Sequence, residues 1–219
     1  MLKPNSFSIL QAVALLLSII CWSSNVLAHS WLDCANMVGS TCKGFPLGYP
    51  SRANPDINTL YTYLIEHRRP TAPVCQPGRQ TAFNKSSNNA QFPPARVAPG
   101  ESLHLTWQAN GHLNENRPTK VEIHWAGKPG RLLHTRSELG PKTLLATMGF
   151  ASAKNCDNPA HPNTWCHGQF KIPAGTKAGA YQVIWWWKFD QNPVGEEYST
   201  CFEVIVQNKK KTGAKRMVA

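Results

Sequence analysis

His29 has the clearest capacity for metal chemistry in this sequence, because the segment before it has the features of a cleavable signal peptide. Lys3 gives a positive start, and residues 8–22 form an apolar run that is too short to span a membrane. Val26 and Ala28 supply short side chains at the −3 and −1 positions of a signal-peptidase site. We therefore predict that residues 1–28 are removed and that His29 begins a secreted, extracellular protein. Cleavage a residue or two away would make His29 an ordinary surface residue.

A histidine at the first position of a chain can bind a metal ion through both its α-amine and its imidazole. One further imidazole completes a T-shaped set of three nitrogen ligands, which favours a single copper ion. Copper held in this way, with an open position, can react with dioxygen or peroxide and a C–H bond. The second imidazole has to come from one of seven other histidines, which are His67, His104, His112, His124, His134, His161 and His167.

The contexts of these histidines favour His112 as the second ligand. His104 and His124 lie inside alternating segments, and a lone histidine in a strand is usually structural. His112 instead ends a turn, Ala109-Asn110-Gly111-His112, directly after a predicted strand. Site residues concentrate in loops that strands hold in place. His161 and His167, which flank Trp165-Cys166, are the alternatives.

The sequence pattern predicts that these residues are positioned by short strands separated by turn residues. Alternating or buried patterns cover residues 102–107, 120–125, 169–172, 180–188 and 199–206. This spacing predicts an all-β fold, an antiparallel sandwich of the immunoglobulin or fibronectin kind. Residues 33–91 are rich in Pro, Asn and Ser and predict long loops, with one short helical turn within residues 57–67. Three consecutive tryptophans, Trp185 to Trp187, must alternate across their strand, so that Trp186 faces opposite to its neighbours.

Six cysteines remain after removal of the signal peptide, and an even number in a secreted chain predicts disulfides. Spacing alone leaves 15 pairings open. A local Cys156–Cys166 bridge is plausible, and Cys201 in a late strand is expected to join an early segment. The six are Cys34, Cys42, Cys75, Cys156, Cys166 and Cys201.

The chain carries a formal net charge of +11, and five of its basic residues lie in the tail after residue 208. We expect one domain over residues 29–207 and a disordered tail over residues 208–219. The alternative role of the tail is weak attraction to an acidic polymer. Export and the absence of a basic helix interleaved with aromatic residues argue against nucleic acid as a partner. We expect a monomer with no membrane span.

Several segments, in order, resemble lytic polysaccharide monooxygenases, the copper enzymes with a "histidine brace". His29 after the signal peptide matches the first ligand of that family. Residues 97–107 followed by Asn110-Gly111-His112 resemble the strand and loop that carry the second ligand. Residues 172–181 resemble the entry to the long penultimate strand, and residues 196–201 (EEYSTC) resemble the stretch with the axial tyrosine and a bridged cysteine. The match extends over most of residues 29–206.

The resemblance implies His29 and His112 as copper ligands and Tyr198 as the axial residue. It also implies that Glu196 hydrogen-bonds the oxygen species at the metal and controls its protonation. The penultimate strand lacks the histidine of the best-known fungal members, and Trp185 or Trp186 is expected to fill that space. The implied reaction hydroxylates a C–H bond next to a glycosidic link and needs an external electron donor.

The implied substrate is a cell-wall polysaccharide. The basic charge favours pectin-type polyuronate, followed by cellulose or chitin, and the opening His29-Ser30-Trp31 resembles the branch found in oomycetes. Trp31 and Tyr49 are the candidate substrate-binding aromatics, and either could instead be buried. The same brace also occurs in non-catalytic proteins that bind or transfer copper, which is the second hypothesis. A metal-free cell-wall-binding sandwich is the third.

Overall fold

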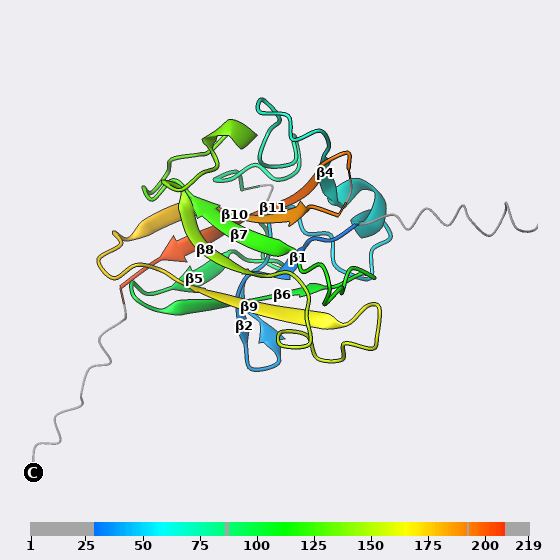
Figure 1. The fold of residues 1–219 in the computed structure, drawn as a ribbon. Coiled ribbons are helices and arrows are strands. Elements are labelled where there is room, and N and C mark those ends of the chain that lie inside the picture. Colours follow the sequence, from blue (N-terminus) through cyan, green and yellow to red (C-terminus); the bar gives the residue numbers. More distant parts are fainter. Residues whose placement is uncertain (1–28, 86–87, 192, 209–219) are drawn as a thin grey trace, which may run out of the picture.

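The chain folds as a sandwich of two β-sheets in a computed structural model, which describes residues 29–85, 88–191 and 193–208 (Figure 1). The smaller sheet holds β1 (Leu32–Cys34), β6 (Ser102–Gln108) and β9 (Trp165–Lys171), in the order β1-β6-β9. The larger sheet has the order β4-β11-β10-β7-β8, with β5 paired to β11. Its strands are β4 (Tyr63–Ile65), β5 (Ala95–Val97), β7 (Lys120–Trp125), β8 (Leu144–Gly149), β10 (Gly179–Phe189) and β11 (Glu196–Val206).

All pairings in the two sheets are antiparallel except that of β5 with β11, so the predicted all-β antiparallel sandwich is confirmed. The five predicted strands correspond to β6, β7, β9, β10 and β11. The sequence reasoning missed β8, because its half-exposed residues, LLATMG, follow no clear alternation. It also missed the short strands β1, β4 and β5.

The segment predicted to consist of long loops contains a small hairpin, β2 (Met37–Val38) with β3 (Thr41–Cys42), and a single turn of π-helix, Ile57–Tyr61. The predicted helical turn therefore exists but ends early, and the chain continues into β4. A second short helix, of the 3₁₀ type, covers Arg136–Glu138. None of the described residues forms a helix long and apolar enough to cross a membrane. The predicted signal peptide and residues 209–219 of the predicted tail lie outside the described residues.

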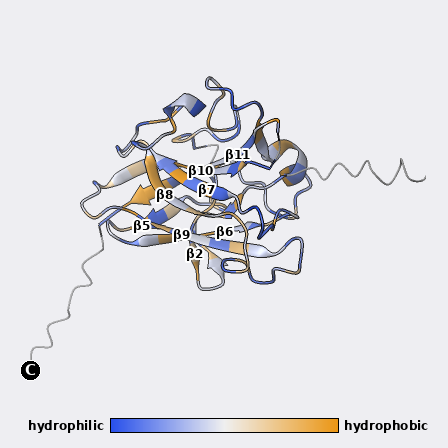
Figure 2. Cartoon of the chain, viewed as in Figure 1, coloured by the Kyte–Doolittle hydropathy of each residue, from blue (hydrophilic) through white to orange (hydrophobic). Residues whose placement is uncertain are grey.

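The core lies between the two sheets and follows from the alternation of side chains along each strand. Leu103, Leu105 and Trp107 of β6 are fully buried, whereas His104, which lies between Leu103 and Leu105, is exposed. On β10, Trp185 and Trp187 point into this core. Figure 2 shows the resulting mixture of hydrophobic and hydrophilic residues along the strands.

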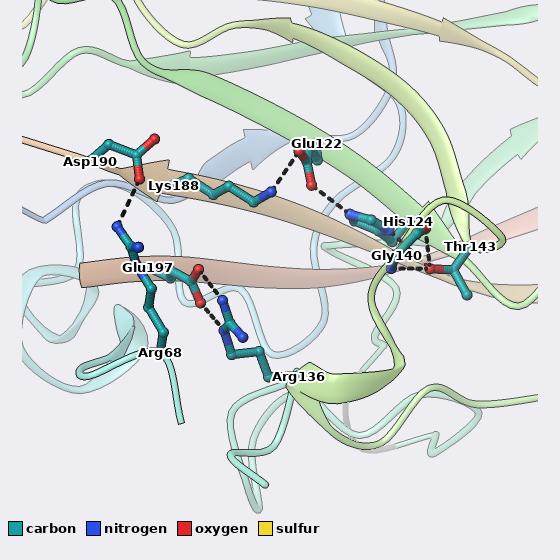
Figure 3. A network of polar contacts seen from close by, with 9 residues as sticks. All are labelled: Arg68, Glu122, His124, Arg136, Gly140, Thr143, Lys188, Asp190 and Glu197. Atoms are coloured by element: carbon teal, nitrogen blue, oxygen red, sulfur yellow. Dashed lines mark hydrogen bonds and ion pairs between the residues drawn. The ribbon is translucent and has the colours of Figure 1, made fainter. Parts of the chain in front are cut away.

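Trp186 points to the opposite face of β10, as predicted, and packs under the loops that cover the larger sheet. It is 1% exposed, in a cluster with Leu47, Ile65 and Leu133. These loops are attached to the sheet by a polar network on the same face (Figure 3). The buried carboxylate of Glu197 accepts hydrogen bonds from the guanidinium of Arg136. The loops therefore complete a second small core on the outside of the larger sheet.

Three disulfides fasten the loops to this frame. Cys156–Cys166 closes the predicted local loop, and Cys201 of β11 pairs with Cys75 in the early segment, as expected. The third bridge, Cys34–Cys42, spans eight residues at the β2–β3 hairpin. A bridge that closes a long loop restricts the unfolded chain most, so Cys75–Cys201, with a separation of 126 residues, is expected to stabilise the fold most.

Candidate metal centre

His29 lies beside the turn that follows β6, because β1 runs antiparallel to β6. Leu32 pairs with Trp107, so three residues before Leu32 meet three residues after Trp107. The amide Nδ2 of Asn110 donates a hydrogen bond of 2.6 Å to the carbonyl oxygen of His29, and Ser30 Oγ donates one of 2.9 Å to the carbonyl of Gln108. The start of the described chain is therefore attached to the segment that carries His112.

The turn itself depends on Asn110 and Gly111, which both have positive φ, +46° and +80°. Asn and Gly adopt this left-handed conformation most readily, and two such residues in succession form a tight primed turn. The His112 amide closes the turn on the Ala109 carbonyl at 2.9 Å, and the Gly111 amide donates to the Pro162 carbonyl at 2.7 Å. The local sequence and the neighbouring loop together fix the direction of His112.

The His112 ring packs against Trp187 and Phe189, with ring centroids 5.2 Å and 4.9 Å away. Its Nε2 atom is buried and has no hydrogen-bond partner among the described residues. Burial first, and the electrostatic effect of the neighbouring His29 second, lower the pKa of His112 to about 4. The imidazole is therefore neutral near pH 7, and an unpartnered buried nitrogen of this kind costs stability unless it gains a ligand.

Tyr198 lies next to His29, with ring centroids 6.5 Å apart and ring planes nearly perpendicular. It pairs with Trp187 across β10 and β11, and the two rings stack at 5.0 Å. Its hydroxyl donates a 3.1 Å hydrogen bond to the Glu196 carboxylate. Burial and then the charge of Glu196 raise the pKa of Tyr198, so the phenol stays protonated. The structure thus gathers His29, His112, Tyr198 and Glu196 at one end of the sandwich.

A family model described as "Domain of unknown function (DUF7492)" matches residues 26–129 and 146–219. The chain belongs to the DUF7492 family. No curated protein matched its sequence.

Two solved structures are similar to this DUF7492 protein in part. One is described as a lytic polysaccharide monooxygenase important for efficient utilization of chitin in Cellvibrio japonicus, with 14% identity and a TM-score of 0.39 over 70% of this chain and 81% of that one. The other is described as a chitin binding domain from Burkholderia pseudomallei, with 14% identity and a TM-score of 0.35 over 82% of this chain and 81% of that one.

The alternative ligands, His161 and His167, have other partners in the DUF7492 chain. His161 is exposed, and its Nδ1 accepts a hydrogen bond from the amide of Asn163. The Nε2 atom of His167 lies 2.7 Å from the Asp157 carboxylate. The loop of His161 nevertheless supports the site, because its Pro162 carbonyl accepts the hydrogen bond from Gly111 in the turn before His112. Within the described ranges, no group of three or more His, Cys, Asp or Glu side chains is arranged to hold a metal ion.

The rings beside His112 come from the end of β10. The residue of the tryptophan run that contacts His112 is Trp187, together with Phe189, rather than Trp185 or Trp186. Trp186 cannot reach His112, because it points to the opposite face of the sheet. Phe189 escaped notice in the sequence because it stands at the end of its strand, although it shares the parity of Trp185 and Trp187.

Trp31 and Tyr49, expected to bind substrate, are buried, with 1% and 8% of their surface exposed. The Trp31 indole and the Tyr49 hydroxyl both donate to the Asp33 carboxylate, at 3.0 Å and 3.1 Å. Because the Asp33 carboxylate is buried, both rings that donate to it lie in the interior. Neither ring can therefore form a flat platform for a polysaccharide. Trp165, which the sequence reasoning noted only for its neighbours, is 36% exposed.

Proposed function

We propose that residues 29–207 form a secreted copper-dependent lytic polysaccharide monooxygenase, which cleaves glycosidic bonds of a cell-wall polysaccharide by oxidation. The observation that carries this proposal is the buried, unpartnered Nε2 atom of His112, held beside His29 by the turn at Asn110. A neutral imidazole nitrogen without a hydrogen-bond donor is available as a metal ligand. This environment fits one copper ion bound by His29 and His112.

The proposal requires that the signal peptide is cleaved after Ala28. Only then does His29 have a free α-amine that can act as the third nitrogen ligand. Two imidazoles and one amine form a donor set suited to copper. Bound copper would supply the oxidation of a C–H bond beside a glycosidic link, with dioxygen or hydrogen peroxide and an external electron donor.

The residues around this site would restrict and orient the chemistry. Tyr198 closes one side of the site with a neutral phenol, since the raised pKa keeps its proton on the oxygen. Glu196 accepts a hydrogen bond from that hydroxyl, and we propose that its carboxylate exchanges a proton with a small molecule at the site. Trp187 and Phe189 exclude water from the inner side of His112.

The substrate proposal rests on charge. The formal net charge of +11 favours an acidic polymer, so pectin-type polyuronate comes first, with cellulose and chitin next. The second candidate function is a non-catalytic protein that binds or transfers copper through the same brace. The burial of Trp31 and Tyr49 favours this alternative, because a copper carrier needs no aromatic face.

Two measurements on the secreted protein test these proposals. N-terminal sequencing should begin His-Ser-Trp, and any other start would exclude the amine ligand. Copper-loaded protein with a reductant should then release oxidised oligosaccharides from pectin, cellulose, chitin or xylan, as detected by mass spectrometry. The matched control is His112→Phe, which should release none. Tight copper binding without an oxidised product on any polymer would support the carrier and contradict the enzyme.

A further inference from the structure

A cavity of about 530 Å³ lies on the outer face of the smaller sheet. Its floor includes Thr106, Trp165 and His167, which alternate with core residues and therefore point away from the core. One wall is the segment of the β2–β3 hairpin, and another holds Phe45 and Tyr49. None of the candidate metal-centre residues lines it, so it is a separate site.

The cavity has an aromatic lining that is fixed in position. Trp165 is 36% exposed, and the guanidinium of Arg52 lies 5.0 Å from its ring centroid. The same guanidinium lies 4.7 Å from the Trp31 ring centroid, and it forms an ion pair with the buried Asp33. The Phe45 ring stacks on Tyr49 at 5.6 Å. Arg52 is therefore held in position beside the Trp165 ring.

The same cavity is lined by a buried threonine whose hydroxyl is unpaired among the described residues. Thr106 is 2% exposed, and its Oγ1 atom is buried without a hydrogen-bond partner among the described residues. Burying an unpaired hydroxyl costs stability, so a ligand hydroxyl that reached this atom would supply the missing hydrogen bond. Asp157 and His167 also line the cavity, and His167 Nε2 lies 2.7 Å from the Asp157 carboxylate. Both side chains are exposed to solvent.

We propose that this cavity binds one neutral pyranose unit of a polysaccharide. A pyranose ring offers an apolar C–H face for Trp165 and hydroxyl groups for Thr106 Oγ1 and the Asp157 carboxylate. An aromatic wall with a few placed polar groups, in a volume of this size, is typical of a small-ligand site. The site binds its sugar whether or not copper is bound at His29 and His112.

The charges of the cavity favour a neutral sugar over a uronate. Its carboxylates, Asp33 and Asp157, are already paired with Arg52 and His167. A sugar carboxylate would therefore find no unpaired cation among the described lining residues, and it would meet the negative charge of Asp157. Hydroxyl groups carry no such penalty.

The test is titration of the full secreted protein, in the presence of a copper chelator, with cellotetraose, xylotetraose, chitotetraose and tetragalacturonate. Calorimetry gives affinity, and the indole N–H signal of Trp165, assigned with Trp165→Phe, reports the site. We expect at least one neutral tetrasaccharide to bind and shift that signal. No binding of any neutral tetrasaccharide, or tighter binding of tetragalacturonate that also shifts the Trp165 signal, would overturn the proposal.

Two variants link the binding to the cavity. Trp165→Ala should weaken affinity at least about tenfold through lost stacking. Thr106→Val, which is nearly isosteric, should weaken it by roughly fivefold, the worth of one hydrogen bond, while leaving stability unchanged or higher. Leu144→Ala, at an exposed position on β8, is the control and should bind normally. Unchanged affinity in both cavity variants would refute this site, whereas a failure of oxidation alone would not affect it.

Discussion

Replacing His112 by phenylalanine should separate metal binding from stability at the candidate metal centre. Phenylalanine keeps a ring against Trp187 and Phe189, which lie about 5 Å away, but it removes the Nε2 atom. That atom is buried without a partner among the described residues, and an unpaired buried polar group costs about 1–3 kcal/mol. The metal-free His112→Phe protein should therefore be as stable as the native protein, or about 1 kcal/mol more stable.

Copper binding should respond in the opposite direction. Changes to groups that only support a metal ligand cost about 10–100-fold in affinity, so loss of His112 itself should cost at least about 100-fold, or about 2.8 kcal/mol. At a free copper concentration about 100 times the native dissociation constant, copper should stabilise the native protein by about 2.7 kcal/mol. The variant should gain less than about 0.5 kcal/mol under the same conditions.

The assay is urea unfolding, followed by tryptophan fluorescence, with chelator and with buffered copper. His104→Ala is the matched control, because His104 is exposed on the smaller sheet and should change neither stability nor copper binding. If His112→Phe keeps the full stabilisation by copper while His104→Ala loses it, then the wrong histidine has been chosen. A large loss of stability in metal-free His112→Phe would show that Nε2 has a structural partner.

Three further predictions concern the frame that holds the site. Burial acts to raise the pKa of Glu122. Hydrogen bonds from Lys188 and His124 outweigh this effect, so the pKa lies below its ordinary value of 4.5. Its charged form therefore contributes stability above about pH 4.5 that is lost as pH falls through the lowered value. Urea unfolding should show Glu122→Gln less stable by up to about 1 kcal/mol at pH 7, and this difference should shrink as the pH falls below about 4.5. Trp186→Ala should cost about 3–5 kcal/mol by thermal or urea unfolding, and a loss below about 1 kcal/mol would contradict its role under the loops. Removing the bridge between Cys75 and Cys201 by serine substitution at both positions should cost about 2–5 kcal/mol, more than removing the eight-residue Cys34–Cys42 bridge, as compared by differential scanning calorimetry.

Local patterns predicted much of the frame. Alternation located β6 and β7, and apolar runs located β10 and β11. Trp186 was placed opposite Trp185 and Trp187, because successive side chains of any strand point to opposite faces. Short strands such as β5 could not be found in this way, since three residues carry too little periodicity. The Asn110-Gly111 turn was recognisable because both residue types tolerate positive φ.

The candidate site was predicted unevenly. Proximity of His29, His112 and Tyr198 followed from a resemblance in sequence, and the structure shows the contacts that bring them together. The rings around His112 could not be assigned from the sequence, because Phe189 lies at the end of β10 and its contact depends on where the turn after β6 crosses the sheet. Trp31 and Tyr49 were misjudged because the buried Asp33, 16 residues from Tyr49, draws both rings inward.

The sequence by itself determined the sheet type, the parity of each long strand and the turn that presents His112, because these depend on residues within a few positions of one another. The tertiary structure decided which outward faces are covered and which remain open. Trp186 and Trp165 both point outward from their sheets, yet loops bury the first and leave 36% of the second exposed. Parity fixes only the side of a sheet, whereas exposure depends on segments far away in the chain that fold over that side.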